Sequence, residues 1–274
     1  MVREYGRMAD TYTHGHHESV LRSHTWRTVE NSAAYLMASL RPGLNLLDVG
    51  CGPGTITADF AARLAPGHVI GVDSASEVVD IARVNASDNT NVEFAVADVY
   101  ALDYEDNSFD IVHAHQVLQH LTDPVAALRE MQRVTKPGGT VAARDSDYSI
   151  FGWAPNDARL TRWLEIYRAV ARKNSAEPDA GRYLLQWAHR AGFTDATYTT
   201  STWSFATDET RAWWGGLWAD RLAHSAFAQQ AVDYGIATTQ ELDQCASAFR
   251  EWSTNAFGTF ITVHGEIIAV RPSP

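Results

Sequence analysis

The sequence predicts a doubly wound α/β fold, in which helices cover both faces of a mostly parallel sheet. Two observations carry this prediction. Between residues 44 and 145, short runs of β-branched and apolar residues alternate with segments of helical periodicity. A glycine-rich turn joins the first of these runs to the first helical segment, the place where such sheets bind ligands.

Five strands are expected in this part of the chain, because each run is short and bounded by turn-forming residues. Each of them is followed by a helical pattern or a turn. Strict alternation of strand and helix requires right-handed crossovers and therefore a parallel sheet. The expected strands are Leu44–Gly50, Val69–Asp73, Val92–Ala97, Phe109–Ala114 and Thr140–Arg144.

The helices between these strands carry their own start and stop signals. Ser74 and Glu77 have the spacing of a capping box, which predicts a helix start. Asp123 followed by Pro124 predicts another start, with proline at the first helical position. The run Lys136–Gly139 ends that helix, with a cation in the last turn and helix-breaking residues after it.

The second half of the chain is rich in aromatic residues and holds eight of the nine tryptophans. Helical spacing predicts a core helix at Tyr183–Ala191, and strands are expected near Asp195–Phe205 and Phe260–Val270. Helical insertions are expected at about 150–178 and 206–256. We therefore predict a segment at 1–40 that precedes the core, followed by one domain at 41–274 that contains these insertions.

Composition excludes several classes of protein. Lysine and arginine number 22 against 33 acidic residues, a formal charge of −11, which disfavours nucleic-acid binding. No apolar run is long enough to span a membrane, and the first ten residues lack the apolar region of a secretory signal. Two cysteines, Cys51 and Cys245, cannot form a disulfide framework. These features predict a cytoplasmic protein without a membrane or nucleic-acid partner.

The strongest motif is the glycine-rich turn, Leu46–Thr55. Gly50 and Gly52 allow a tight turn and a close approach of ligand to backbone. A dinucleotide fingerprint needs a third small residue at position 55, where this chain has threonine, and Pro53 removes an amide that a pyrophosphate would use. The turn favours a nucleoside ligand without phosphates, so an NAD-dependent oxidoreductase is the less favoured alternative.

Three acidic residues lie at strand ends near this turn. Asp73 ends the second strand, where a carboxylate can accept both hydroxyls of a ribose. Asp98 ends the third strand and can accept from an exocyclic adenine amine while Val99 packs on the ring. Asp48, just before the turn, can hold loop amides or a ligand ammonium. Their order at consecutive strand ends makes the set specific, although a single acid there is more often a cap.

Together these motifs resemble the class I S-adenosylmethionine (SAM)-dependent methyltransferases, nearest the small-molecule branch that includes ubiquinone/menaquinone-biosynthesis-type enzymes. The resemblance covers roughly residues 40–145. It implies a Rossmann-like seven-stranded sheet with an antiparallel last strand, SAM as cofactor, and no metal. The motifs are Leu47–Gly54, Gly71–Asp73, Ala97–Val99, Phe109–Val112 with Val117–Leu121, and Arg133–Gly139.

The resemblance also assigns cofactor-binding residues. The glycines lie under the methionine part, Asp73 holds the ribose with Ser74 beside it, and the backbone carbonyl of His115 faces the ammonium. In related enzymes the segment before the core covers the cofactor, so Tyr12 and Arg27 are expected to contact it. The full set is Tyr12, Arg27, Asp48, Gly50, Gly52, Gly54, Asp73, Ser74, Asp98, Val99 and His115.

The acceptor is expected to be a small, apolar or aromatic molecule methylated at an O, C or N centre. Tyr148, Trp153 and Trp214 lie beyond the ligand edge of the sheet and are the proposed acceptor-binding residues, although aromatic stripes are more often core. A non-catalytic SAM-binding module is the main alternative. The catalytic residues and the oligomeric state stay open, with a homodimer as one candidate.

Histidines invite two further hypotheses. The run His14–His17 lacks accompanying carboxylate or thiolate ligands at a recognisable spacing, so no metal site is expected there. His113 and His115 share one strand face near the ligand edge, where a general base is conceivable. For His113, a hydrogen-bonded structural role is the favoured interpretation.

Overall fold

In the computed structural model, which describes residues 13 and 24–273, one mixed sheet of eight strands runs through the molecule. Its order is β3-β2-β1-β4-β5-β8-β6, and β7 pairs with β8. The strands are β1 (Leu46–Val49), β2 (Val69–Asp73), β3 (Val92–Val96), β4 (Phe109–His115), β5 (Thr135–Ser146), β6 (Gly152–Ala154), β7 (Asp195–Phe205) and β8 (Thr259–Val270).

The predicted doubly wound sheet with an antiparallel last strand is confirmed. Strands β1 to β5 are parallel to one another, and β8 pairs antiparallel with β5 and with β7. Two details differ from the expectation. β5 begins at Thr135 rather than Thr140, and the three-residue β6 adds an eighth strand by pairing with the start of β8. β6 is too short to have a periodicity that could be recognised in the sequence.

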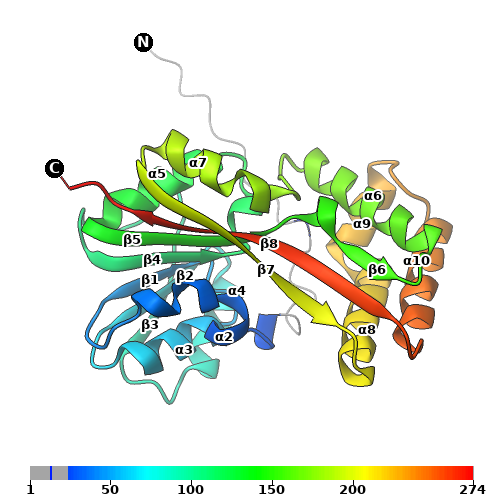
Figure 1. Ribbon diagram of the computed structural model, residues 1–274, viewed down its shortest axis with the longest axis horizontal. Coiled ribbons are helices and arrows are strands. Elements are labelled where there is room, and N and C mark those ends of the chain that lie inside the picture. The colour runs from blue at the N-terminus through cyan, green and yellow to red at the C-terminus, as the bar shows by residue number, and fades with distance from the viewer. Residues whose placement is uncertain (1–12, 14–23, 274) are drawn as a thin grey trace, which may run out of the picture.

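Helices cover both faces of the sheet and form a separate cap beyond its end (Figure 1). The α-helices are α2 (Val29–Ser32), α3 (Thr55–Leu64), α4 (Ser76–Asn85), α5 (Pro124–Val134), α6 (Ala158–Lys173), α7 (Leu184–Ala191), α8 (Asp208–His224), α9 (Ala226–Asp233) and α10 (Thr239–Ser253). The 3-10 helices are η1 (Ala34–Ser39), η2 (Leu118–His120), η3 (Tyr148–Ile150) and η4 (Ala180–Tyr183).

Local capping explains where several helices begin. Asp123 accepts a hydrogen bond from the Ala126 amide at the start of α5, as its spacing predicts. The predicted capping box at Ser74 does not form, because α4 begins only at Ser76 with Ala75 as its N-cap. The Asp73 carboxylate accepts instead from the amide of Ala75, the N-cap residue itself, and no side chain caps the first turn of α4.

Alternation along β5 shows how the sheet buries both of its faces. Val141 and Ala143 pack in the cluster that includes residues of α5 and α7, whereas Ala142 packs in the cluster formed with α3. Both clusters consist of fully or nearly fully buried apolar side chains. The sheet is therefore the middle layer of three, and its strand ends are fixed by packing on each side.

The cap has a core of its own, built from aromatic residues of α6, α8, α10 and β8. Trp163 and Trp218 meet edge to face with ring centroids 4.5 Å apart. β7 and β8 run on from the sheet into the cap (Figure 1), where Phe260 of β8 is fully buried in the aromatic cluster. These strands fix the cap relative to the carboxyl edge of the parallel strands.

Candidate functional site

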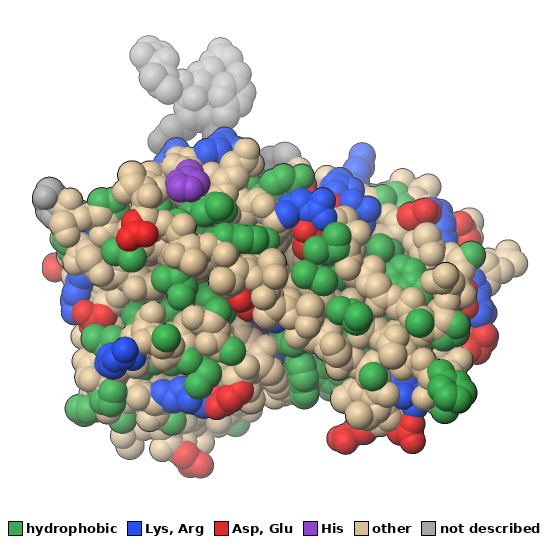
Figure 2. All heavy atoms as spheres, in the orientation of Figure 1, with side chains coloured by type: hydrophobic (Ala, Val, Ile, Leu, Met, Phe, Trp, Pro, Cys, Tyr) green, Lys and Arg blue, Asp and Glu red, His purple; other side chains and the backbone are tan. Residues whose placement is uncertain are grey.

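A cavity of about 620 Å³ lies between the carboxyl edge of the parallel strands and the cap. Its residues fall into two groups. The acidic half is formed by the turns after β1, β2 and β3, and comprises Asp48–Pro53, Val72–Ser74 and Ala97–Tyr100. The aromatic half is formed by the ends of β4 and β5, by η2 and η3, by β7 and β8, and by α8. It comprises His115, Gln119, His120, Ser146, Tyr148, Phe151, Trp203, Trp213, Trp214, Arg221, Thr262 and His264. Figure 2 shows an indentation of the surface between the lobe that contains the sheet and the cap.

The turn after β1 has room for a ligand because its glycines carry no side chains. Gly50 has a φ of +69°, and a Cβ there would lie 2.3 Å from Cγ2 of Val117. Gly52 lines the cavity and donates its amide to the Asp73 carboxylate at 3.1 Å. Gly54 has a different role, because it is buried at the start of α3 and is not among the residues that line the cavity.

Two of the predicted acids stand at the ends of neighbouring strands and face the same cavity. Asp73 is half-buried, and its two oxygens accept from the amides of Gly52 and Ala75, both at 3.1 Å. Asp98 is exposed and accepts from the Tyr100 amide at 2.9 Å. Each carboxylate oxygen has further lone pairs for a ligand hydroxyl or amine. Ser74 and Val99 line the cavity beside them.

Asp48 lines the cavity, but its carboxylate is bound to protein side chains rather than to loop amides. Oδ2 accepts from the Thr57 hydroxyl at 2.6 Å, and Oδ1 lies 2.7 Å from Nδ1 of His113. All three side chains are buried. Asp48 therefore joins β1 to β4 and α3 beneath the turn, and His113 is hydrogen-bonded as the sequence suggested.

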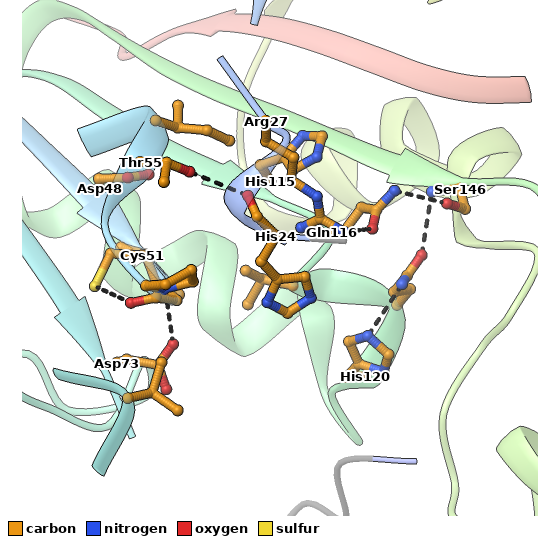
Figure 3. A pocket seen from close by; sticks show the side chains of 18 of the residues that line it. His24, Arg27, Asp48, Cys51, Thr55, Asp73, His115, Gln116, His120 and Ser146 are labelled. Carbon is orange, nitrogen blue, oxygen red and sulfur yellow. Dashed lines mark hydrogen bonds between the residues drawn. The ribbon is translucent and has the colours of Figure 1, made fainter. Parts of the chain in front are cut away.

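Arg27 lies at the boundary between the two halves. Its Nη2 donates to Oε1 of Gln116 at 2.6 Å, and its guanidinium lies 5.8 Å from the ring centroid of Trp203. Gln116 in turn donates to the Ser146 hydroxyl at 3.1 Å. Figure 3 shows Arg27 and His115 between the glycine-rich turn and the Gln116–Ser146 side of the pocket.

His115 is a buried histidine without a hydrogen bond inside the described chain. The side chain is 5% exposed and lines the cavity, and neither ring nitrogen has a partner among the described residues. Burial, together with the charges of Arg27 and Arg144, holds the pKa of His115 well below its ordinary value. The imidazole is therefore neutral and can both donate and accept a hydrogen bond.

Two further histidines of the aromatic half are also neutral. Burial lowers the pKa of His120 to about 3, and the charge of Arg27 adds to the shift. His264 accepts from Nη2 of Arg144 at 3.0 Å, and its pKa is lowered by burial and by the charges of Arg144 and Arg27. The aromatic half thus contains three uncharged imidazoles at neutral pH.

Stacked rings form much of the aromatic half. Tyr148 stacks on Phe151 at 4.4 Å, and Trp214 stacks on Phe205 at 4.3 Å with an interplanar angle of 6°. Tyr148 and Trp214 line the cavity, but Trp153 does not. Pairing of β6 with β8 places Trp153 against Phe260, where it stacks at 5.6 Å on the cap core, away from the cavity.

Cys51 also lines the cavity, but its environment argues against a nucleophilic role. The thiol is buried beside Asp48 and Asp73, and both burial and these charges raise its pKa. A thiol that stays protonated is a poor nucleophile. Its role here is to pack beneath the ligand-binding turn, in a cluster with Val79 and Phe94.

Several residues of the cavity were not expected from the sequence. Trp203 on β7 and Thr262 and His264 on β8 come from strands far along the chain from the glycine-rich turn. The signal that could have found them is the alternation of Thr262, His264 and Glu266 on one face of the last strand. Further unexpected lining residues are His24, Gln116, Gln119, Ser146 and Arg221.

Some predictions fall on residues outside the described ranges. Tyr12 and the run His14–His17 belong to this group. Within residues 13 and 24–273, no group of three or more metal-ligating side chains is present. In the same part of the chain, no helix combines the length and apolar character needed to cross a bilayer.

Comparison with known proteins identifies the family. The sequence model of a family described as "Methyltransferase domain" matches residues 40–199. An uncharacterized methyltransferase of Schizosaccharomyces pombe is 35% identical over 94% of this chain and 95% of its own. A ubiquinone/menaquinone biosynthesis C-methyltransferase of Shewanella frigidimarina is 31% identical over 74% of this chain and 83% of its own.

A solved structure shows the same fold. The phosphoethanolamine N-methyltransferase 2 of Haemonchus contortus, in complex with S-adenosyl-L-methionine, superposes with a TM-score of 0.53 at 18% identity. The match covers 85% of this chain and 50% of that one. At this identity the likeness concerns the fold alone.

Proposed function

This chain belongs to the methyltransferase domain family and is a SAM-dependent methyltransferase, and from that premise we propose that it methylates a small, apolar or aromatic acceptor at an O, C or N centre. The cavity that carries this proposal has acids and an open backbone turn in one half and aromatic rings in the other. The proposal concerns the acceptor and the roles of individual residues.

The acidic half fits the cofactor. A Cβ at Gly50 would collide with Val117, so the open turn exists only because that residue is glycine. Asp73 and Asp98 keep free lone pairs for the ribose hydroxyls and the adenine amine of the cofactor. When bound, SAM supplies a methyl group on a positively charged sulfur.

We assign the cofactor contacts as follows. Asp73 with Ser74 holds the ribose, and Asp98 with Val99 holds the adenine. The backbone of the glycine-rich turn lies under the methionine part, and the His115 carbonyl faces the ammonium. Arg27 pairs with the carboxylate, since its guanidinium stands at the boundary of the two halves. Asp48 and Gly54 support the turn from below rather than contacting the ligand.

The acceptor lies in the aromatic half. Trp214 stacks on Phe205 with one face, and Tyr148 is stacked between Phe151 and Tyr167, so Tyr148 offers an apolar acceptor its ring edge. The described end of the segment at 1–40 covers this region, because Trp26 contacts Trp203 at 5.1 Å and Trp213 at 5.2 Å. Trp26 therefore helps to exclude water from the aromatic half and to align the acceptor for in-line transfer.

A product assay tests this proposal against its alternatives. The protein is incubated with SAM and a panel of small aromatic and aliphatic acceptors, and S-adenosylhomocysteine (SAH) is quantified by chromatography. We expect acceptor-dependent SAH with at least one aromatic acceptor, and at least about tenfold less of it with Asp73→Ala at limiting SAM. Binding of SAM without SAH from any acceptor would favour a non-catalytic module. Thermal stabilisation by NADH but not by SAH would favour an oxidoreductase.

A further inference from the structure

Two buried hydrogen-bond donors on the wall of the aromatic half have no partner in the described part of the chain. They are Nε1 of Trp214 on α8 and the hydroxyl of Thr262 on β8. The two side chains are 6% and 1% exposed, and both line the cavity. Buried polar groups of folded proteins nearly always have a hydrogen-bond partner. The contents of the cavity therefore have to supply one.

The two donors lie on the same wall, where β7 and β8 enter the cap beside α8 (Figure 1). Thr262 pairs with Trp203 across the two strands and shares a strand face with Phe260, two residues before it. Trp214 stacks on Phe205, the strand partner of Phe260, and its ring centroid lies 5.5 Å from that of Phe260. Both donors are therefore neighbours of Phe260.

The described side chains around these donors do not satisfy them. The rings that contact Trp214 belong to phenylalanine and tryptophan residues, which carry no hydrogen-bond acceptor. His264 follows Thr262 on the same strand face, but both of its ring nitrogens are engaged. One lies 3.0 Å from Arg144 and the other 3.1 Å from Gln116. A partner for both donors has to come from a molecule in the cavity.

The chemistry of the two donors limits what that molecule can be. An indole N–H only donates, so its partner must be an acceptor, and the hydroxyl of Thr262 can donate to the same atom. A carbonyl or hydroxyl oxygen has two lone pairs, one for each donor. An ammonium group has only donors and would leave Trp214 unsatisfied.

The charges at the cavity do not call for a charged group at this wall. Among the described lining residues, the acids all belong to the acidic half. The cations that line the cavity are already engaged, Arg27 with Gln116 and Arg221 with the ring of Trp218. A neutral oxygen satisfies both donors without the cost of burying a charge, so it is favoured over a carboxylate or a phenolate.

The two donors stand far from the cofactor half of the cavity. β4 and β5 lie between β1 and β8 in the sheet, which makes three strand spacings, or about 14 Å. His115 at the end of β4 stands between them, with its ring centroid 5.9 Å from that of Trp203. An acceptor that is methylated beside the glycine-rich turn and reaches this wall therefore carries the bound oxygen at its far end.

We propose that the methyl acceptor is a planar ring system with a neutral carbonyl or hydroxyl oxygen remote from the methylated atom, and that this oxygen accepts hydrogen bonds from Trp214 and Thr262. The aromatic lining of this half suits a planar ring system. Trp214 and Thr262 determine which acceptors bind, because an apolar ring of the same shape leaves both donors unsatisfied. This inference rests on the proposed methyltransferase function and narrows its acceptor class.

Matched probes separate the oxygen from the shape of the ring. 2-Acetylnaphthalene and 2-isopropenylnaphthalene differ in a carbonyl oxygen against a methylene carbon, and 2-naphthol and 2-methylnaphthalene differ in a hydroxyl against a methyl group. Binding of each probe to full-length, cofactor-stripped protein is measured at pH 7 by equilibrium dialysis. We expect at least one oxygen-bearing probe to bind at least about tenfold more tightly than its apolar match, the effect of two net hydrogen bonds. The pair that shows this preference identifies the recognised oxygen as carbonyl or hydroxyl.

Two variants remove one donor each. Thr262→Val is near-isosteric and Trp214→Phe keeps an aromatic ring, so a change of shape affects both members of a probe pair alike. Each variant should lower the affinity ratio of the pair at least about threefold. A purely structural role of either residue would weaken both probes and leave the ratio unchanged.

The matched controls are Trp163→Phe and Thr202→Val. Nε1 of Trp163 on α6 also has no partner among the described residues, but it lies in the cap core and does not line the cavity. Thr202 lies next to Trp203 on the opposite, exposed face of β7. Both controls should keep the wild-type ratio, and thermal melts identify any variant that fails to fold. If Trp214→Phe does not fold, Thr262→Val decides the test.

Three results would overturn the proposal. Wild-type protein could show no preference for either oxygen-bearing probe, the two donor variants could keep the wild-type ratio, or the controls could lower the ratio as much as the donor variants do. The preference should also persist in saturating SAH, because the donors lie far from the cofactor half. Competition between SAH and the oxygen-bearing probe would contradict that placement.

A calorimetric titration with SAH separates this inference from the proposed function. SAH binding without a probe preference would refute the acceptor class and leave the methyltransferase function standing. A probe preference without SAH binding would instead refute the cofactor assignment, while the oxygen-binding wall would stand on its own measurement.

Discussion

The acidic and aromatic halves of the cavity are built in different ways. The acidic half comes from three turns that each follow one strand of the parallel sheet, and the carboxylates of Asp73 and Asp98 accept from nearby backbone amides. The aromatic half brings together β4, β7, β8 and α8, and several of its polar groups have no partner among the described residues. The polar groups of the first half are thus largely satisfied within the protein, whereas the second half leaves several unsatisfied.

The difference shows which kind of site a sequence reveals. A turn-based site depends on short motifs, so its residues lie close together in the chain. A site between a sheet and a cap depends on where distant elements meet. The four predictions below test the contrast between a satisfied half and an unsatisfied one, from the largest expected effect to the smallest.

The largest effect is expected at Asp145, directly behind the aromatic half. Oδ1 accepts from the Gln119 amide at 3.1 Å, whereas Oδ2 has no partner among the described residues, and burial raises the pKa to about 8. Because the folded pKa lies above the unfolded value, folding favours the protonated acid. The free energy of unfolding should therefore fall as pH rises, by about 4 kcal/mol between pH 5 and pH 8 from this group.

Asp145→Asn should remove that part of the pH dependence. Urea unfolding of both proteins at pH 5 and pH 8 measures it. If the two proteins lost the same stability over this range, Asp145 would not be a buried neutral acid. The contrast with Asp73, both of whose oxygens accept from amides, would then fail.

Gly50→Ala should disrupt the acidic half. Gly50 has a φ of +69°, which an alanine adopts only with strain. An added Cβ would also lie 2.3 Å from Cγ2 of Val117, so the turn must move. We expect a loss of about 3 kcal/mol in the free energy of unfolding, with loss of SAH binding. Gly43→Ala is the matched control, since Gly43 has a φ of +91° but no atom within 4 Å of its Cβ position.

Chemical denaturation and calorimetry of the two glycine variants separate backbone strain from collision. The control should lose only about 1 kcal/mol and retain SAH affinity. Equal losses in both variants would mean that Gly50 is needed for its φ alone.

Asp73→Ala tests the ribose contact. Removing the carboxylate takes away a ligand partner and the acceptor of the Gly52 and Ala75 amides. The SAH dissociation constant should rise at least about tenfold, about 1.4 kcal/mol. The exposed Asp88, in the turn between α4 and β3 and away from the cavity, provides Asp88→Ala as a control. An unchanged dissociation constant for Asp73→Ala in calorimetry would remove Asp73 from the site.

The smallest effect is expected in the cap, where two adjacent glycines of α8 differ. Gly216 has open space at its Cβ position, so Gly216→Ala should stabilise the protein by about 0.7 kcal/mol. Gly215 lies against α10, with its Cβ position 2.6 Å from Cβ of Ser253, so Gly215→Ala should destabilise it. Thermal unfolding compares the two. Effects of the same sign would contradict the close packing of α8 on α10.

Much of the fold could be predicted because its signals are local. The bounds of β2 at Val69–Asp73 and of β7 at Asp195–Phe205 agree with the expectation, since each run has strand-forming residues and clear turns at its ends. The Asp123 cap also forms as expected. The capping box predicted at Ser74 did not form, because α4 begins two residues later and the amide of its N-cap residue, Ala75, donates to Asp73.

The aromatic half could be predicted only in part because burial on β8 reverses the usual pattern. Ile261 is 43% exposed, whereas its polar neighbour Thr262 is 1% exposed and His264 is fully buried. A reading that places apolar side chains inside therefore puts the wrong face of this strand toward the ligand. The prediction that Trp153 lines the acceptor site was wrong, because the three residues of β6 carry too little pattern to predict its pairing with β8.

A crystal structure of the protein with SAH tests the central claim most directly. We expect both ribose hydroxyls within about 3 Å of the Asp73 carboxylate. We also expect the adenine beside Asp98 and Val99, and the sulfur directed toward His115 and the aromatic half. An adenosine seated among Tyr148, Trp203 and Trp214, or one that leaves Asp73 untouched, would contradict the division of the cavity into a cofactor half and an acceptor half.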